Sequence, residues 1–301
     1  MSAELVAEIG ERRAWRSAAA AVRAMRPQQW TKNLLLFAGI VFAAKLGDGV
    51  RWAEAAASFA LYCAASSAAY LFNDVRDRAA DTAHPLKRRR PLASGDLAVR
   101  AALGLAGVLA AVALTLALVL GTESVALVGG FAALQATYTL GLKHMVVVDV
   151  VAIAGLFVIR AAAGAVAVHV PISPWLLVCS GLLALFLALG KRRGELVLVE
   201  SRATPGRRVL HTYSLTALDR LVALVAAVTV AVYAAYTVSA HDLRALPVTI
   251  PLVAFGLGRY VYLLRRRGLG EEPDQVLVSD KPILVTVAVW VVVCAVVLAV
   301  G

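Results

Sequence analysis

Nine apolar stretches of about 20 residues recur along this 301-residue chain, and each is long enough to cross a hydrocarbon core of about 30 Å as an α-helix. Hydrophobic residues make up 61% of the sequence and charged residues 16%, which leaves too little polar surface for a water-soluble domain. The stretches are too long for barrel strands and do not alternate between apolar and polar residues. We therefore expect an all-α polytopic membrane protein with about nine transmembrane helices, near residues 30–46, 52–72, 99–120, 123–142, 146–168, 173–190, 214–238, 246–264 and 282–300.

The distribution of Lys and Arg predicts the orientation of these helices. Alternate connections contain only Lys45, Arg51 and Arg244 of the 30 basic residues. Because cytoplasmic loops carry the excess of Lys and Arg, the loops after the second, fourth, sixth and eighth helices should face the cytoplasm. We expect the N-terminus on the cytoplasmic side of the cell (inner) membrane and the C-terminus outside. Residues 1–25 are expected to form an interfacial helix, followed by a transmembrane domain over 26–301.

A row of oxygen ligands follows the second predicted helix. Asn73, Asp77 and Asp81 are four residues apart, so they fall within an arc of about 80° on one helical face, and Asp74 lies about 60° from Asp77. Carboxylates this close repel one another unless a divalent cation lies between them, and Mg²⁺ typically takes one or two carboxylates together with substrate phosphates. The row predicts a magnesium site. A solvated helix end is less favoured, because dense charge at a membrane interface is costly unless it is used.

A cationic cluster lies in the same connection. Lys87, Arg88 and Arg90 follow Asp81 within nine residues. A metal ion that bridges oxygens, with Lys and Arg alongside to neutralise the remaining charge, suits a diphosphate. A topology signal or a contact with anionic lipid is the alternative for the cluster alone. Nucleic acid is not expected as a partner, because the basic residues are divided among membrane-bounded loops without interleaved aromatic residues.

The motif Asn73-x3-Asp77-x3-Asp81 after a transmembrane helix resembles the first aspartate-rich motif of the UbiA superfamily of intramembrane prenyltransferases. Residues 26–33, 73–91, 142–149 and 190–196 resemble the branch of that superfamily whose members act on decaprenyl phosphate. The resemblance implies a UbiA-like bundle and Mg²⁺ dependence. It also implies transfer of 5-phosphoribose from phosphoribosyl diphosphate (PRPP) to a polyprenyl phosphate, with release of diphosphate, in the synthesis of cell-wall arabinan precursors.

The resemblance also implies roles for individual residues. Asn73, Asp77 and Asp81 would hold Mg²⁺, and the aspartates Asp74, Asp77 and Asp81 would be the catalytic residues. The lipid phosphate would be the nucleophile and is already ionised at neutral pH, so catalysis would rest on positioning and on stabilisation of charge rather than on a general base. The residues expected to bind substrate are Gln29, Lys32, Asn33, Lys87, Arg88, Arg90, Tyr138, Lys143, Asp149, Arg160, Lys191 and Arg192.

The loop expected after the sixth helix departs from the superfamily pattern. Superfamily members that use prenyl diphosphates have a second aspartate-rich motif there, whereas this chain has Lys191 and Arg192 with Glu195 as the one acid in the matching stretch. A basic loop suits a donor that carries an additional phosphate on C5. Two alternatives stay open: a prenyltransferase that uses a polyprenyl diphosphate and another acceptor, and a transporter of anionic lipid, which would need polar groups near the midplane of several helices. A homo-oligomer is possible.

Arg160 lies in the middle of the fifth predicted helix. A buried arginine at this depth should face the interior of the bundle and have an anionic partner. The partner could be a substrate phosphate, or it could be Asp149, which lies eleven residues earlier on the same helix.

Overall fold

The computed structural model describes residues 17–42, 47–200, 213–239, 245–267, 276 and 279–300. Within these ranges the regular elements are all helical, and seven helices are long and apolar enough to cross a membrane. Residues 17–25 are helical, while the rest of the predicted interfacial helix lies outside the described residues. The chain is an all-α integral membrane protein.

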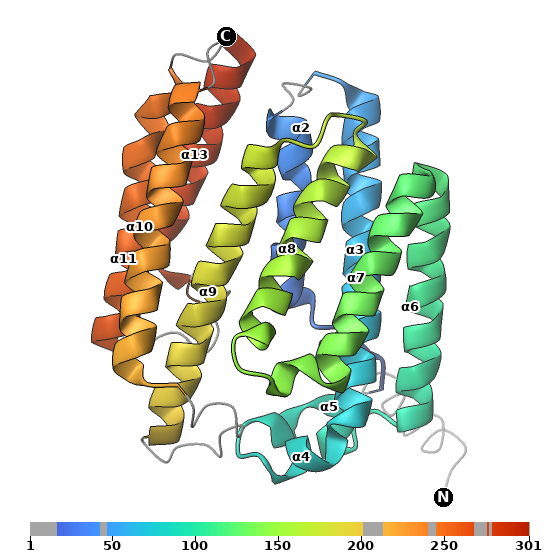
Figure 1. The fold of residues 1–301 in the computed structure, drawn as a ribbon. Helices are drawn as coiled ribbons and strands as arrows, with labels where there is room; N and C mark the ends of the chain where they lie inside the picture. The colour runs from blue at the N-terminus through green and yellow to red at the C-terminus, as the bar shows by residue number, and fades with distance from the viewer. Residues whose placement is uncertain are drawn as a thin grey trace, which may run out of the picture.

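The long helices form a single bundle, with the short helices α4 and α5 at one end of it and α2 near the other (Figure 1). The long helices are α3 (Gly49–Arg76), α6 (Val99–Leu120), α7 (Thr122–Leu140), α8 (Val148–Ala167), α9 (Pro174–Glu200), α10 (Leu215–Ser239), α11 (Ile250–Arg267) and α13 (Lys281–Val300). The short elements are η1 (Pro27–Phe37), α2 (Ala38–Phe42), α4 (Arg78–Ala83), η2 (Lys87–Arg89), α5 (Pro91–Ser94), η3 (Leu142–His144) and η5 (Leu246–Thr249).

Local sequence sets several helix ends. The Asp48 carboxylate caps α3 by accepting hydrogen bonds from the amides of Val50 and Arg51, as expected of an N-cap aspartate. α6 and α7 are joined at Gly121, whose φ of 111° is available to glycine at little steric cost. α7 has 19 residues but carries Glu123 and Gln135, and it is not among the seven apolar spans.

The first predicted span, 30–46, differs from the expectation of a regular helix. The chain instead forms the eleven-residue 3₁₀ helix η1 followed by the five-residue helix α2. Runs of 3₁₀ helix longer than three or four residues are uncommon and often mark strain or a functional segment. Tertiary contacts hold this one: the Trp30 indole donates to the Ser67 hydroxyl at 3.1 Å, and Leu36 of η1 lies so close to α8 that a Cβ added to Gly164 would be 2.2 Å from the Leu36 carbonyl oxygen.

The end of the sixth predicted helix also differs. It was expected at residue 190, but α9 continues to Glu200, so Lys191, Arg192 and Arg193 lie in a helix and not in a loop. These charges are tolerated in the helix because two of them have acidic partners: Arg192 pairs with the buried Asp149 at 2.6 Å and Arg193 with the half-buried Asp219 at 2.7 Å.

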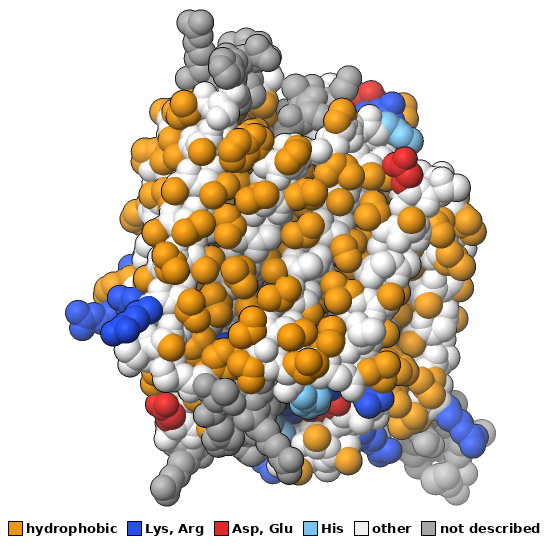
Figure 2. Space-filling model, in the orientation of Figure 1, with side chains coloured by type: hydrophobic (Ala, Val, Ile, Leu, Met, Phe, Trp, Pro, Cys, Tyr) orange, Lys and Arg blue, Asp and Glu red, His pale blue; other side chains and the backbone are white. Residues whose placement is uncertain are grey.

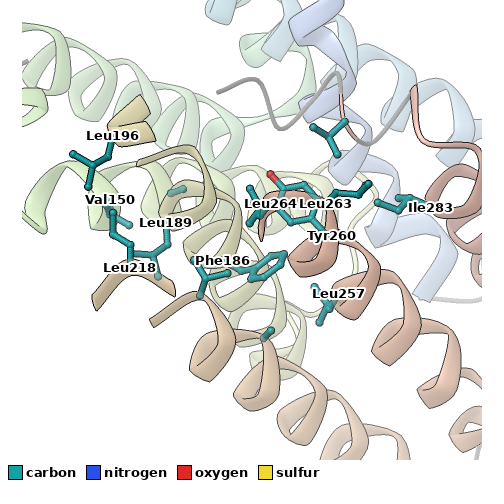
Figure 3. Close-up of a cluster of buried hydrophobic side chains, with 14 residues drawn as sticks. Val150, Phe186, Leu189, Leu196, Leu218, Leu257, Tyr260, Leu263, Leu264 and Ile283 are labelled. Atoms are coloured by element: carbon teal, nitrogen blue, oxygen red, sulfur yellow. The ribbon is translucent and has the colours of Figure 1, made fainter. Parts of the chain in front are cut away.

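Two large clusters of buried hydrophobic side chains hold the bundle together. One joins α9, α10, α11 and α13 with the start of α8, and Figure 3 shows Phe186 and Tyr260 in it, with ring centroids 5.2 Å apart. The other joins η1, α3, α6, α7 and α8 around Tyr62 and Phe131. The outer face is covered by apolar side chains, and blue Lys and Arg side chains gather mainly toward the end that carries α4 and α5 (Figure 2). That end holds the predicted site.

Candidate active site

The predicted row of acids keeps its helical spacing although α3 ends within it. α3 stops at Arg76, and α4 begins at Arg78. The backbone still makes i→i−4 hydrogen bonds from Asp77 to Asn73 and from Asp81 to Asp77, both at 2.8 Å. The four-residue spacing therefore places Asn73, Asp77 and Asp81 along one side of the chain, as the sequence predicted.

We call Asn73, Asp74, Asp77 and Asp81 the acid row. Each of its aspartates is paired with a base from another element. Asp74 is buried and accepts from Arg26 at 2.5 Å and from Arg90 at 3.3 Å. The same Arg90 nitrogen contacts Asp81 at 2.7 Å. Lys143 lies 2.8 Å from both carboxylate oxygens of Asp77. The structure thus brings the predicted residues Arg90 and Lys143 directly onto the acid row.

The donor set of the row fits a magnesium ion in its chemistry. The donors are carboxylate and amide oxygens, which Mg²⁺ prefers, and one buried oxygen of Asp74, Oδ2, has no hydrogen-bond partner. Among the described residues, however, no three His, Cys, Asp or Glu side chains are grouped closely enough to hold a metal ion. The acids are instead neutralised by Lys and Arg, so a metal ion would have to compete with these bases for the carboxylates.

A second buried network lies where α8 begins. Asp149 is fully buried in the first turn of α8 and pairs with Arg192 of α9 at 2.6 Å. Arg192 also binds Glu195 and donates to the Tyr138 hydroxyl at 3.3 Å. Arg192 is only 1% exposed, so its guanidinium is enclosed by these partners.

Tyr213 completes this network from the residues just before α10. Its hydroxyl donates to Asp149 at 3.3 Å and accepts from the Val147 amide at 2.9 Å. Val147 has φ 67°, a conformation that is strained for a β-branched residue. Burial raises the pKa of Tyr213, and the nearby Asp149 carboxylate adds to this rise. The hydroxyl therefore stays protonated as a donor while it holds the strained turn before α8.

Arg160 does not pair with Asp149. The two residues lie eleven positions apart, which is about 16 Å along a helix, and Asp149 is occupied by Arg192. The described partners of Arg160 are neutral: Asn33 Oδ1 at 2.7 Å, Ser66 Oγ at 3.3 Å and the Leu156 carbonyl at 3.0 Å. Its guanidinium also lies 4.6 Å from the Phe131 ring centroid. The predicted buried position is correct. Of the two alternatives for its partner, the pair with Asp149 is wrong, and a contact with a substrate phosphate stays a prediction.

The remaining predicted residues lie on η1, η2 and α9 and differ in exposure. Gln29 and Lys32 lie on η1 and contact each other at 2.5 Å. Asn33, which was expected at the substrate, is fully buried and faces Arg160. Lys87 and Arg88 lie on η2, where Arg88 is exposed and Lys87 half-buried. Lys191 is half-buried on α9.

His84 shapes the loop that carries these cations. Its Nδ1 accepts hydrogen bonds from the amides of Leu86 and Lys87, at 3.2 and 3.3 Å. Burial and the nearby positive charge of Lys87 lower the pKa of His84. The neutral imidazole is the form that can accept these bonds, so the observed loop depends on an uncharged His84.

Three residues of the site were not predicted from the sequence. Arg26 immediately precedes Pro27 in the segment that carries the family resemblance; it pairs with Asp74 and lies 5.0 Å from the ring centroid of Tyr70. Tyr70 itself sits one turn before Asp74 and could have been found by that spacing. Tyr213 carried no local signal, because it is 64 residues from Asp149 in the chain.

Comparison with known proteins identifies the class to which this fold and site belong. Residues 34–279 match the UbiA prenyltransferase family, and the chain belongs to that family. A UbiA homologue from Archaeoglobus fulgidus, solved with GPP and Mg²⁺, superposes with a TM-score of 0.72 at 17% identity over 93% of this chain and 99% of its own.

Two relatives are much closer in sequence. The decaprenyl-phosphate phosphoribosyltransferase of Mycolicibacterium smegmatis is 34% identical over 284 residues, covering 90% of this chain and 89% of the relative. The protein of the same name from Corynebacterium glutamicum is 37% identical over 281 residues, covering 90% and 84%.

Proposed function

We propose that this chain transfers 5-phosphoribose from PRPP to a polyprenyl phosphate and releases diphosphate. The similarity to named decaprenyl-phosphate phosphoribosyltransferases over about nine-tenths of the chain supports this reaction most strongly. The basic segment of α9 supports it as well. Glu195 is the one acid in the stretch where enzymes that use prenyl diphosphates have a second aspartate-rich motif, and Arg192 binds it. The product would be a lipid-linked sugar phosphate of the kind used to build cell-wall arabinan.

The reaction needs charge neutralisation more than proton transfer. An oxygen of the lipid phosphate forms a bond to C1 of the ribose, while the bond from C1 to the diphosphate breaks and the diphosphate leaves with the electron pair. Arg26, Arg90 and Lys143 already converge on the acid row, so they are placed to bind phosphate oxygens of the leaving group. Such charge-assisted hydrogen bonds strengthen as negative charge develops.

Magnesium would be held by oxygens of the acid row. Asn73, Asp77 and Asp81 supply the predicted ligands, with the unpartnered Asp74 Oδ2 as a further one. When bound, Mg²⁺ would neutralise the departing diphosphate.

The site would face the cytoplasm. The N-terminus and the basic ends of the helices would lie on the cytoplasmic side of the cell (inner) membrane, and the C-terminus outside, in keeping with the excess of Lys and Arg at one end. PRPP is water-soluble and carries at least three negative charges. It would then reach the acid row without crossing the bilayer. A polyprenyl phosphate would present its headgroup at the same interface.

Incubation of the purified protein with radiolabelled PRPP and decaprenyl phosphate tests the reaction. We expect label in the organic phase, and its loss in EDTA. Asp77→Asn should abolish transfer while the protein remains folded in detergent, because one carboxylate of the row is lost without a change of shape. A protein that ignores PRPP but transfers a prenyl group from geranylgeranyl diphosphate to an aromatic acceptor would contradict the proposal.

A further inference from the structure

The bases that neutralise the acid row come from three separate parts of the chain. Arg26 precedes η1, Arg90 is the N-cap residue of α5, and Lys143 lies in η3. Each reaches an aspartate at 2.5 to 2.8 Å. The free protein therefore holds two complementary sets of charge in mutual contact: carboxylates of the kind that bind a divalent cation, and cations of the kind that bind phosphate.

Either ligand alone meets a penalty in such a site. A metal ion that takes Asp77 must displace Lys143, whose side chain is only 8% exposed, and would leave its ammonium next to a new dication. A diphosphate that takes Lys143 would leave Asp77 uncompensated beside additional negative charge. The Asp77 side chain is 30% exposed, but the Lys143 ammonium is buried, so its charge would be left without compensation if Asp77 turned away.

Both ligands together remove both penalties. The carboxylates can turn to the metal while the bases turn to phosphate oxygens, so every charge keeps a partner of opposite sign. Arg90 supports this exchange, since one of its nitrogens contacts both Asp74 and Asp81; its departure would free Asp81, while Asp74 would keep its ion pair with Arg26.

We propose that Lys143, Arg90 and Arg26 are exchangeable counter-ions of the acid row, and that their ion pairs make binding of the divalent cation and binding of diphosphate mutually dependent. The idea rests on the proposed function, because it assumes a metal and a diphosphate as ligands. It assigns Lys143 a role beyond substrate contact: in the free protein it competes with the metal for Asp77.

Binding of each ligand alone tests the proposal. Mn²⁺ serves as the metal probe, followed by the loss of its free EPR signal, and inorganic diphosphate in EDTA serves as the metal-free anion, followed by calorimetry. Lys143→Met should bind Mn²⁺ alone about tenfold more tightly than the wild type, because the competing ion pair is gone. Asp77→Asn should bind metal-free diphosphate about tenfold more tightly, because Lys143 is released.

The matched control is Lys281→Met, an exposed lysine at the start of α13, which should change neither affinity. If Lys143→Met aggregates in detergent, Lys143→Gln removes the same charge and serves in its place. Unchanged or weaker Mn²⁺ binding in the Lys143 variant, or unchanged diphosphate binding in Asp77→Asn, would overturn the proposal.

The transfer assay separates this failure from failure of the proposed function. A wild-type protein that transfers phosphoribose, with no gain of Mn²⁺ affinity in the Lys143 variant, would overturn the counter-ion role alone. The expected affinity gains in a protein that does not use PRPP would support the counter-ion role and contradict the reaction.

Discussion

At the scale of single residues, Arg192 shows which part of a site the sequence can predict. Its contact with phosphate stays a prediction, and in the structure its guanidinium joins Asp149, Glu195 and Tyr138 in the interior. The charge of Arg192 could be predicted from the sequence, and so could its place near the site. Its partners could not, because Asp149 and Tyr138 come from other helices and only the tertiary fold brings them together.

Arg192→Ala should therefore destabilise the protein more than it weakens substrate binding. Removal of one member of a buried ion pair costs on the order of 3–5 kcal/mol, because Asp149 would be left buried and uncompensated. Thermal unfolding in detergent should show a lowered midpoint, with Arg88→Ala, at an exposed position, as the control that unfolds like the wild type. An unchanged midpoint, with a raised KM for PRPP, would instead support a direct contact between Arg192 and the substrate.

His84 predicts a pH dependence of the cationic loop. Its pKa is lowered in the folded protein, by burial first and by Lys87 second, so folding favours the neutral imidazole. The contribution of His84 to stability is fully present above its ordinary pKa of 6.5. It is lost as the pH falls from there through the lower pKa that His84 has in the folded protein. Protonation removes the Nδ1 acceptor of the Leu86 and Lys87 amides.

Hydrogen exchange measures this directly. After correction for intrinsic rates, the Leu86 and Lys87 amides should be protected at pH 7.5 and lose protection as the pH falls below 6.5. In His84→Ala they should exchange rapidly at both pH values. Equal protection across the range in the wild type would show that His84 does not hold the loop.

At the scale of elements, hydropathy predicted the apolar helices well and failed where tertiary contacts decide. α6 was expected over 99–120 and spans Val99–Leu120, because an uninterrupted apolar segment in lipid must satisfy its own backbone hydrogen bonds. α9 extends ten residues further than expected because ion pairs neutralise its charged end. The 3₁₀ form of η1 had no signal in the sequence, since it is held by contacts with α3 and α8.

The contact between η1, α2 and α8 depends on the absence of side chains at two glycines. A Cβ at Gly164 would lie 2.2 Å from the Leu36 carbonyl oxygen, and one at Gly39 would lie 2.6 Å from the Gly164 carbonyl oxygen. These are backbone atoms, so relief requires the elements to move apart. Small residues at helix crossings in membranes commonly serve this close approach.

Gly164→Ala should lower the thermal unfolding midpoint and also reduce transfer activity, because η1 carries Gln29 and Lys32 and follows Arg26. The matched control is Gly107→Ala on α6, where an added Cβ meets nothing within 4 Å and alanine favours helix by about 1 kcal/mol over glycine. The control should unfold at or above the wild-type midpoint. Equal behaviour of the two variants would mean that the close approach is not required.

At the scale of the whole molecule, the two ends of the bundle differ in charge and in function. The acid row, its bases and the cationic loop lie at the end with α4 and α5, and α13 finishes at the other end (Figure 1). At the end away from the acid row, Arg51 pairs with Glu54 at 2.7 Å, and Glu54 also lies 3.6 Å from His169. Among the described residues at this end, the charge of Arg51 is therefore compensated by Glu54, whereas Lys87, Arg88 and Arg89 follow one another at the end with the site.

This asymmetry predicts the sidedness of the protein, because basic segments are retained in the cytoplasm. Cysteines introduced at Arg88, in the cationic loop, and at Glu123, beside the α6–α7 turn, are both at exposed positions and lie at opposite ends of α6. The background would lack the native Cys63, Cys179 and Cys294.

On intact cells an impermeant maleimide should label Glu123→Cys, and it should label Arg88→Cys only after the membrane is permeabilised. Both variants should react in detergent, which checks that each thiol is accessible. Labelling of Arg88→Cys from outside intact cells would place the acid row on the wrong side of the membrane for a soluble cytoplasmic donor, and would contradict the orientation and the choice of PRPP together.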